Sequence, residues 1–268
     1  SPKGFFIRPY YRIVTMSLQG KKVVITRPKH QSDTIIKRLE AKGAIPIFFP
    51  TIEIKMAADT AALDQAIKNI DQYDWIVITS ANGVNFFLQR MKELGIDSAI
   101  LNKKKIATVG TVTQEKLASR NIQVDFVPEQ FVADVLGATI PIQKGEKILL
   151  PQSDIAREKL IKQLEDRGAI VNSFAAYETR TKSIDLNSMN ELIGSDIDWI
   201  CFTSASTAKG LEQAFKDHQK EIPNTPCAVI GPVTQKAALA KGFNVVASAN
   251  PHTIDGLIAA MTSNSSPY

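Results

Sequence analysis

The sequence predicts an α/β protein with two parallel-sheet domains that arise from a direct repeat. Two observations carry this prediction. Short runs of β-branched and aliphatic residues alternate with segments of helical periodicity, and a long stretch of the chain is repeated at a nearly constant offset. An apolar content of 44% and a charged content of 22% are ordinary for a globular protein, so composition does not argue against this class.

The repeat becomes visible when Gly20 is aligned with Gly145, an offset of 125 residues. GKKVVIT…IIKRLEAKGAI then falls on GEKILLP…LIKQLEDRGAI without a gap. DWIVITSANGV (74–84) corresponds to DWICFTSASTA (198–208), and ATVGTVTQEKLASRNIQV corresponds to AVIGPVTQKAALAKGFNV at an offset of 121. Because the offset drifts by only a few residues, the repeated feature is a supersecondary pattern rather than a shared composition.

Each element of the first copy follows from local pattern. Ser32 or Asp33 is expected to be the N-cap of the first helix, and Gly43 is expected to end it. Clusters of β-branched and aliphatic residues predict strands at 23–26, 45–49, 75–79, 106–109 and 124–127. Further helices are expected at 82–94, from 113 and at 133–139. Continuous apolar strands that alternate with helices indicate a parallel sheet covered on both faces.

The domain arrangement has two readings from the residues alone. The simplest is a sequential division near residue 143. Alternatively, PTIEI (50–54) and AYETR (176–180), which occupy corresponding repeat positions, cross side by side between the domains. The first βα unit would then complete the C-terminal domain.

Charge and terminal residues limit the function classes. The net charge is +5, but residues 1–15, expected to be a tag or an upstream segment, hold Lys3, Arg8 and Arg12 and no acid. The remaining +2 is too mild to argue for nucleic acid. No apolar stretch is long enough to span a membrane. Cys201 and Cys227 lie in strand-like runs, which favours reduced core thiols and a cytoplasmic protein.

The loops that follow the expected strands suggest anion binding. In a parallel sheet these loops gather at one edge, and here they are rich in Ser, Thr and Gly and open onto helix N-termini. The chain has no P-loop, no dinucleotide fingerprint and no zinc-protease motif, and its three histidines show no triad spacing. If the protein is an enzyme, it is expected to hold a reactive substrate in shape, with no metal.

Differences between the two copies point to candidate site residues, because a site often breaks the symmetry of its scaffold. Arg27 corresponds to Gln152, Asn82 to Ser206, and Tyr177 to Ile52. An arginine just past a strand end can contact a carboxylate through two N–H groups, although a surface ion pair is the alternative. A tyrosine hydroxyl stays protonated at neutral pH and can donate to a leaving oxygen, although packing of the crossing segment is the alternative.

VVITRP, DWIVITSANGV, the paired turns VGTVT and IGPVT, and AAYETR, in this order and spacing, resemble the uroporphyrinogen-III synthase family over residues 17–262. The resemblance implies two flavodoxin-like domains joined by a two-stranded linker. It assigns residues 17–50 with 180–262 to one domain and 54–176 to the other. It also implies a cleft between the domains and no cofactor.

The resemblance further implies that the substrate is hydroxymethylbilane, a linear tetrapyrrole. The product would be uroporphyrinogen III, formed with loss of water and inversion of ring D. Tyr177 matches the tyrosine proposed to assist departure of the substrate hydroxyl. The substrate-binding candidates are Arg27, Ser80, Asn82, Thr113, Ser206 and Thr234. Asn82 departs from the pattern, because some family members have a basic residue there.

Two rival functions remain at this point. A non-catalytic two-domain binder of small molecules would share the fold, because fold does not fix function. A receiver-like regulatory module would need an acidic pair after its first strand, and VITRPKH has none. A monomer is expected, with no nucleic-acid or membrane partner and possible transient contact with the preceding pathway enzyme.

Overall fold

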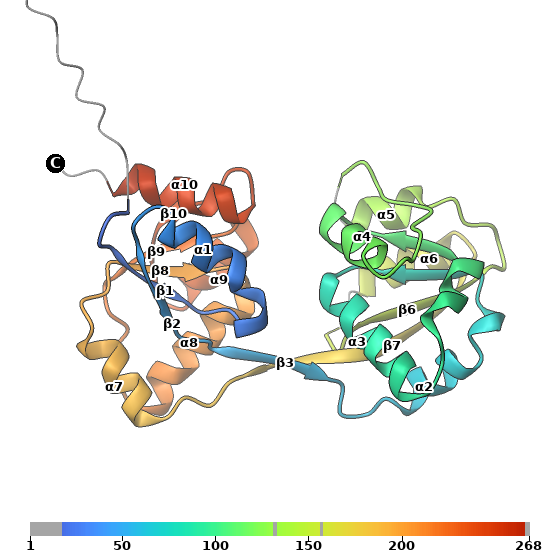
Figure 1. Cartoon of the computed structure of the whole chain (residues 1–268), viewed down its shortest axis with the longest axis horizontal. Helices are drawn as coiled ribbons and strands as arrows, with labels where there is room; N and C mark the ends of the chain where they lie inside the picture. The colour runs from blue at the N-terminus through green and yellow to red at the C-terminus, as the bar shows by residue number, and fades with distance from the viewer. Residues whose placement is uncertain (1–17, 131–132, 156–157, 266–268) are drawn as a thin grey trace, which may run out of the picture. The chain divides into compact units, whose positions relative to one another are not determined.

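The computed structural model describes residues 18–130, 133–155 and 158–265, which form two compact units (Figure 1). The first unit consists of the chain up to Glu53 together with the chain from Thr181, and the second is Ile54–Arg180. The expected tag at residues 1–15 lies outside the described residues. Each unit is an α/β structure around one five-stranded sheet, so the predicted fold class is confirmed.

The sheet of the first unit has the strand order β10-β9-β8-β1-β2, and every neighbouring pair is parallel. Its strands are β1 (Lys22–Ile25), β2 (Ile45–Phe48), β8 (Trp199–Phe202), β9 (Pro226–Val229) and β10 (Asn244–Ser248). Numbered by their order within this unit, the strands are arranged 2-1-3-4-5, which is the flavodoxin-like order. The N-terminal pair β1–β2 therefore shares a sheet with strands from the far end of the chain.

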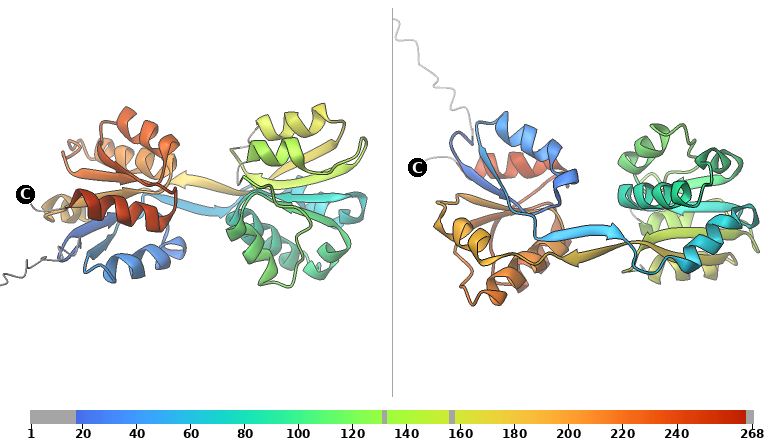
Figure 2. Two further views of the ribbon diagram at one scale, coloured as in Figure 1. Left: turned by 90° about the horizontal axis from the view of Figure 1, so that it is seen from above. Right: turned by 60° about the horizontal axis from the view of Figure 1, so that its bottom comes forward.

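Helices cover both faces of this sheet, as Figure 2 shows. They are α1 (Asp33–Glu40), α7 (Leu186–Gly194), α8 (Ala205–Asp217), α9 (Pro232–Ala240) and α10 (Ile254–Asn264). One apolar core packs α1 and α10 against Val23 and Cys201, and a second packs α7, α8 and α9 against Val24 and Phe202. Neighbouring residues of β1 thus point into opposite cores, which explains why the strand is apolar from Val23 to Ile25.

The second unit has the strand order β3-β7-β6-β4-β5. Its strands are β3 (Ile52–Met56), β4 (Trp75–Ile78), β5 (Lys105–Thr108), β6 (Lys147–Ser153) and β7 (Ile170–Thr181). Its helices are α2 (Ala61–Lys68), α3 (Ala81–Glu93), α4 (Thr111–Ala118), α5 (Ala133–Thr139) and α6 (Glu158–Asp166). Parallel pairing joins β7, β6, β4 and β5, with α2, α3 and α4 over one face and α5 and α6 over the other.

The strands β3 and β7 carry the chain from one unit to the other. They are neighbours in the sheet, and the backbone bonds Ala57 N–H to Ala176 O and Lys182 N–H to Thr51 O show that they run antiparallel. The segment 176–180, expected to cross between the domains beside residues 50–54, is part of the long strand β7. The predicted two-stranded linker is therefore present.

Some local predictions need correction. Ser32 occupies the N-cap position of α1 but makes no side-chain cap bond, because its hydroxyl donates to the Pro28 carbonyl at 2.8 Å. The strand expected at 124–127 is only a single bridge between Phe126 and Ala107, because the Asp125 carboxylate takes the Ile106 N–H. Helix α4 begins two residues earlier than expected.

Other local predictions hold. Gly43 follows α1 with φ at +76°, a conformation that glycine adopts without strain, and its N–H bonds to the Glu40 carbonyl. None of the helices in the described ranges is long and apolar enough to cross a membrane. Cys201 and Cys227 are buried free thiols, and burial raises the pKa of Cys227 to about 12 and raises the pKa of Cys201 as well.

Candidate functional site

In the second unit, the loop after β4 delivers the N-terminus of α3 to the carboxyl edge of the sheet. Ser80 is the N-cap of α3, and its Oγ accepts a hydrogen bond from the Gly83 N–H at 3.0 Å. A Cβ on Gly83 would lie 3.0 Å from Ile78 Cγ2 and 3.4 Å from the Pro151 carbonyl oxygen. Glycine therefore lets the first turn of α3 approach β6 closely, which fixes the position of the half-buried Ser80.

Tyr177 reaches the same edge from β7. It pairs with Ser153 at the end of β6, and the register shifts by one residue just before this pair. Such a bulge redirects the side chains that follow it. The Tyr177 ring stacks on Phe86 of α3 with centroids 5.7 Å apart, and its hydroxyl lies 3.0 Å from Ser80 Oγ. Tyr177 is only 9% exposed, so its ring is packed as well as placed at the edge.

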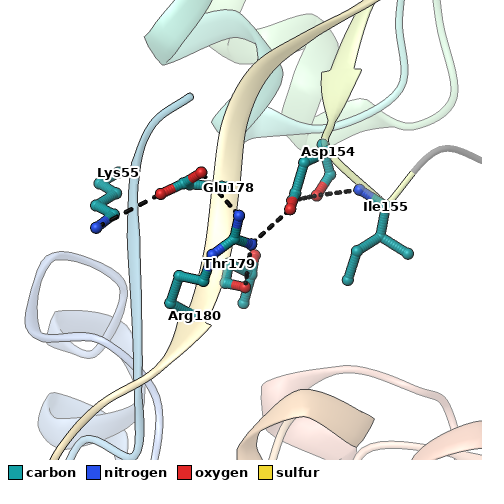
Figure 3. A network of polar contacts seen from close by, with 7 residues as sticks. Lys55, Asp154, Ile155, Glu178, Thr179 and Arg180 are labelled. Atoms are coloured by element: carbon teal, nitrogen blue, oxygen red, sulfur yellow. Dashed lines mark hydrogen bonds and ion pairs between the residues drawn. The ribbon is translucent and has the colours of Figure 1, made fainter. Parts of the chain in front are cut away.

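A charged network that includes Lys55, Asp154, Glu178 and Arg180 holds the part of β7 that follows Tyr177 (Figure 3). The Asp154 N–H donates to the Tyr177 carbonyl at 2.9 Å, and Arg180 donates to the Asp154 carboxylate at 2.5 Å. Arg180 also donates to Glu178, which pairs with Lys55 at 3.4 Å. Partial burial alone would raise the pKa of Asp154, but the bonds from Arg180 and from the Ser153 hydroxyl outweigh it and hold this pKa below its usual value.

In the first unit, Arg27 lies just past β1. It is half-buried, and its Nη2 donates to Gln31 Oε1 at 3.4 Å. Its Nε is buried without a hydrogen-bond partner, and no carboxylate within the described ranges pairs with the guanidinium. Burial lowers the pKa of Arg27. A desolvated cation with an unused N–H group is suited to an incoming carboxylate.

The first unit repeats the serine cap with a different neighbour. Ser204 is the N-cap of α8, and its Oγ accepts from the Thr207 N–H at 3.3 Å. Ser204, rather than the predicted Ser206, therefore occupies the position equivalent to Ser80. Ser206 is the second residue of α8 and is half-buried, as is Asn82 at the second position of α3.

The two predicted threonines lie on the inner side of their helices. Thr113 in α4 is 5% exposed and Thr234 in α9 is 4% exposed, so both hydroxyls are largely inside their own units. Val112 and Val233 in these turns are exposed, at 68% and 76%, and so are Thr111 and Pro232. What the turns present at the edge is therefore the backbone of a helix N-terminus and an apolar valine, together with the exposed Thr111 in the second unit.

The described residues include no group of three or more His, Cys, Asp or Glu that could hold a metal ion. The chemistry carried by the predicted residues is that of hydroxyl groups, an amide and a guanidinium. These groups bind carboxylates and position or donate protons. Of the predicted residues, the structure brings Ser80 and Tyr177 into direct hydrogen-bond contact.

Comparison with known proteins decides the family. The family described as "Uroporphyrinogen-III synthase HemD" matches residues 17–259. The chain belongs to the uroporphyrinogen-III synthase family. The resemblance seen in its motifs is thereby confirmed.

Members of the uroporphyrinogen-III synthase family from several organisms are similar to this chain. A "Porphyrin biosynthesis protein HemD" of Ruminiclostridium josui is 32% identical over 244 residues, covering 90% of this chain and 48% of that protein. The chain thus spans about half of that relative. A "Uroporphyrinogen-III synthase" of Synechococcus elongatus is 31% identical over 258 residues, covering 91% of this chain and 95% of that protein.

Solved uroporphyrinogen-III synthase structures share the fold. The enzyme of Helicobacter pylori matches with a TM-score of 0.63 at 16% identity, covering 92% of this chain and all of that chain. A mutant enzyme of Thermus thermophilus matches with a TM-score of 0.62 at 17% identity, covering 91% and 98%. At these identities the likeness concerns the fold alone.

The sequence did not point to several residues that shape the candidate site. In the sequence, Phe86 cannot be distinguished from any other apolar residue of a helix. Asp154 and Arg180, which bond to each other, lie 26 positions apart in polar segments that match no motif. Ser204 could have been found, because the 124-residue offset that aligns the two Asp-Trp pairs also aligns Ser80 with Ser204.

Proposed function

We propose that the chain closes hydroxymethylbilane to uroporphyrinogen III, with loss of water and inversion of ring D. Family membership across residues 17–259 supports this activity. The observation that carries the chemical assignment is the contact between Tyr177 and Ser80, which holds a phenol at the edge of the second unit within 3.0 Å of a second hydroxyl.

In this proposal Tyr177 is the catalytic residue. Its phenol donates a proton to the hydroxyl of the substrate as the carbon–oxygen bond breaks, so the group leaves as water. The carbon left behind is electron-poor and is attacked by the α-carbon of ring D that already carries the bridge to ring C, which gives a spirocyclic intermediate. The bond between that α-carbon and the bridge then breaks, the bridge carbon bonds to the free α-carbon of ring D, and the proton released there restores the phenol. Proton donation by a single group is worth on the order of 10²–10⁴-fold in rate.

The remaining catalytic effect is assigned to positioning, which is worth roughly 7–11 kcal/mol when reacting groups are well aligned. Arg27 is proposed to bind one carboxylate arm, supported by its buried, unused Nε. Asn82 and Ser206 are proposed to bind further arms beside the N-termini of α3 and α8, where backbone N–H groups favour anions.

Thr113 and Thr234 are proposed to contribute through their turns. Their hydroxyls are buried, so the groups offered to a carboxylate are the backbone N–H groups of the first helical turns that these residues anchor. Many weak contacts of this kind share the binding of a substrate with several acidic arms. No single one of them is expected to be indispensable.

The proposed setting is a cytoplasmic monomer that takes its substrate from the preceding pathway enzyme, with at most transient contact between the two proteins. The substrate is unstable and closes without inversion when left alone, so rapid transfer would be an advantage. Size-exclusion chromatography with light scattering tests the monomer directly.

The decisive experiment supplies freshly made hydroxymethylbilane and resolves the product isomers. The products are oxidised and separated by chromatography into isomers I and III. Isomer III in excess of the uncatalysed reaction is the expected result. If only isomer I appeared at the uncatalysed rate, the proposed activity would be wrong and a non-catalytic binder would be favoured.

A further inference from the structure

Three groups in the second unit form a continuous hydrogen-bond chain that ends on the proposed catalytic phenol. The Gly83 N–H donates to Ser80 Oγ at 3.0 Å, and Ser80 Oγ lies 3.0 Å from the Tyr177 hydroxyl. Gly83 is in the first turn of α3, where backbone N–H groups have no partner within the helix and lie at the positive end of its dipole.

Either hydroxyl can donate in the second bond, and donation from Ser80 to Tyr177 is the direction that leaves the phenol hydrogen free. Ser80 Oγ already accepts the Gly83 N–H, and its own hydrogen remains available for donation. If that hydrogen goes to the Tyr177 oxygen, the phenol keeps its own hydrogen for another acceptor. A chain of hydrogen bonds in this sense polarises each member, so the phenol becomes a better donor.

We propose that Ser80 is a positioning residue for Tyr177: it donates to the phenol oxygen and directs the phenol hydrogen toward the substrate hydroxyl. This inference rests on the proposed function and changes the role of Ser80 within it. Ser80 acts through Tyr177 and the helix cap rather than as a ligand of a substrate carboxylate.

Other contacts already fix the ring and backbone of Tyr177, so the role left to Ser80 is to set the direction of the hydroxyl hydrogen. The ring is stacked on Phe86 at an interplanar angle of 20°, and the backbone carbonyl is held by the Asp154 N–H. With ring and backbone fixed, the remaining freedom is rotation of the hydroxyl hydrogen about the C–O bond. A donor on one side of the oxygen selects the orientation that points away from that donor.

The first unit offers a natural comparison for the cap alone. Ser204 caps α8 through the Thr207 N–H, as Ser80 caps α3 through Gly83. The residue that corresponds to Tyr177 in this copy is Ile52, which has no hydroxyl. Ser204→Ala therefore removes a helix cap without removing a contact to a tyrosine.

A double-mutant cycle on kcat tests the proposal. Ser80→Ala is expected to lower kcat by roughly tenfold, the equivalent of one hydrogen bond, with KM within about twofold of the unaltered protein. The Ser80→Ala/Tyr177→Phe double variant is expected to be no slower than Tyr177→Phe alone. Ser80→Thr retains a hydroxyl and a cap and is expected to restore kcat.

Each alternative result has a distinct meaning. A raised KM with unchanged kcat in Ser80→Ala, or an additive loss in the double variant, overturns the proposal while leaving Tyr177 as the acid. An unchanged rate in Tyr177→Phe instead removes the proposed acid itself. Urea unfolding of Ser80→Ala and Ser204→Ala at the assay temperature measures how much each helix cap contributes to stability. If Ser80→Ala loses rate because it is partly unfolded, its unfolding midpoint will be lowered.

Discussion

Asp198 accepts a hydrogen bond from the backbone N–H of Lys22 at 2.9 Å, although the two residues are 176 positions apart. Asp74 makes the same contact with the N–H of Lys147 at 2.8 Å. Asp198 directly precedes β8 and binds the start of the neighbouring strand β1, and Asp74 directly precedes β4 and binds the start of the neighbouring strand β6. The aspartates of the repeated Asp-Trp pairs therefore join strands that are distant in the sequence. They lie at the edge where the strands begin, opposite to the edge of the candidate site.

Replacing these aspartates is expected to weaken folding without altering the site. Asp198→Asn and Asp74→Asn each remove a charged acceptor from a strand N–H, and each is expected to lower the free energy of unfolding by about 1–2 kcal/mol. Urea denaturation followed by circular dichroism measures this. Asp196→Asn, an exposed change two residues from Asp198, is the matched control and is expected to stay within about 0.5 kcal/mol. Equal stabilities for Asp196→Asn and Asp198→Asn would contradict the assigned role.

The Asp198 contact also predicts a dependence of stability on pH. Burial alone would raise the pKa of Asp198, but the Lys21 ammonium and the Lys22 N–H outweigh it, and the pKa lies below its usual value in the folded protein. A carboxyl group with a lowered folded pKa stabilises the fold above its unfolded pKa and loses that contribution as the pH falls through the folded value. The stability difference between the unaltered protein and Asp198→Asn should therefore shrink between about pH 5 and pH 2. A constant difference over this range would argue against the charge as the cause.

The sequence predicted the positions of the strands and helices better than it predicted which strands pair. Strand and helix positions follow from local periodicity, and all the first-copy strands except 124–127 form within two residues of the expected limits. The pairing of β1 with β8 is different, because a β1–β2 unit satisfies the same local pattern whichever sheet it joins. The resemblance to a family, rather than periodicity, pointed to that arrangement.

For the candidate site, the differences between the two sequence copies pointed to Tyr177 and Arg27. The side-chain contacts of these residues could not be predicted from the sequence. The bond between Tyr177 and Ser80 depends on a one-residue register shift in β7, and such a shift leaves no local signature in the sequence. Thr113 and Thr234 were selected by their match to the family's glycine-turn motifs, which does not reveal that their side chains face inward.

Replacing Arg27 is expected to weaken substrate binding without lowering the stability of the fold. Arg27→Met removes a desolvated cation whose Nε has no partner, so the free energy of unfolding is expected to be unchanged or slightly higher. KM for hydroxymethylbilane is expected to rise on the order of tenfold, because one charge-assisted bond is lost. Arg38→Met removes the same charge from an exposed pair with Asp255 and serves as the control. A KM that rises equally in both variants would indicate a general charge effect instead.

The two thiols are expected to be inert in the folded protein. Cys201 and Cys227 are 1% and 0% exposed, and burial raises the pKa of both, so little thiolate is present and little of it is accessible at neutral pH. A thiol reagent such as DTNB should react with neither thiol in buffer at pH 7.5 and with both in urea. Rapid reaction of one thiol in the folded state would show that local opening exposes its strand.

Tyr177→Phe is expected to slow kcat by roughly 10- to 100-fold, the lower part of the range for a general acid, while the fold is kept. The ring remains stacked on Phe86 in this variant, and only the hydroxyl that contacts Ser80 is removed. Tyr73→Phe is a close control: Tyr73 is also buried in the second unit, its hydroxyl bonds Asn172 at 3.0 Å, and it precedes β4, at the opposite edge of the sheet from Ser80. Because both variants lose one phenol hydrogen bond, similar losses of stability are expected, with a loss of rate confined to Tyr177→Phe. Equal rates in the two variants would assign Tyr177 to packing, as its 9% exposure also allows.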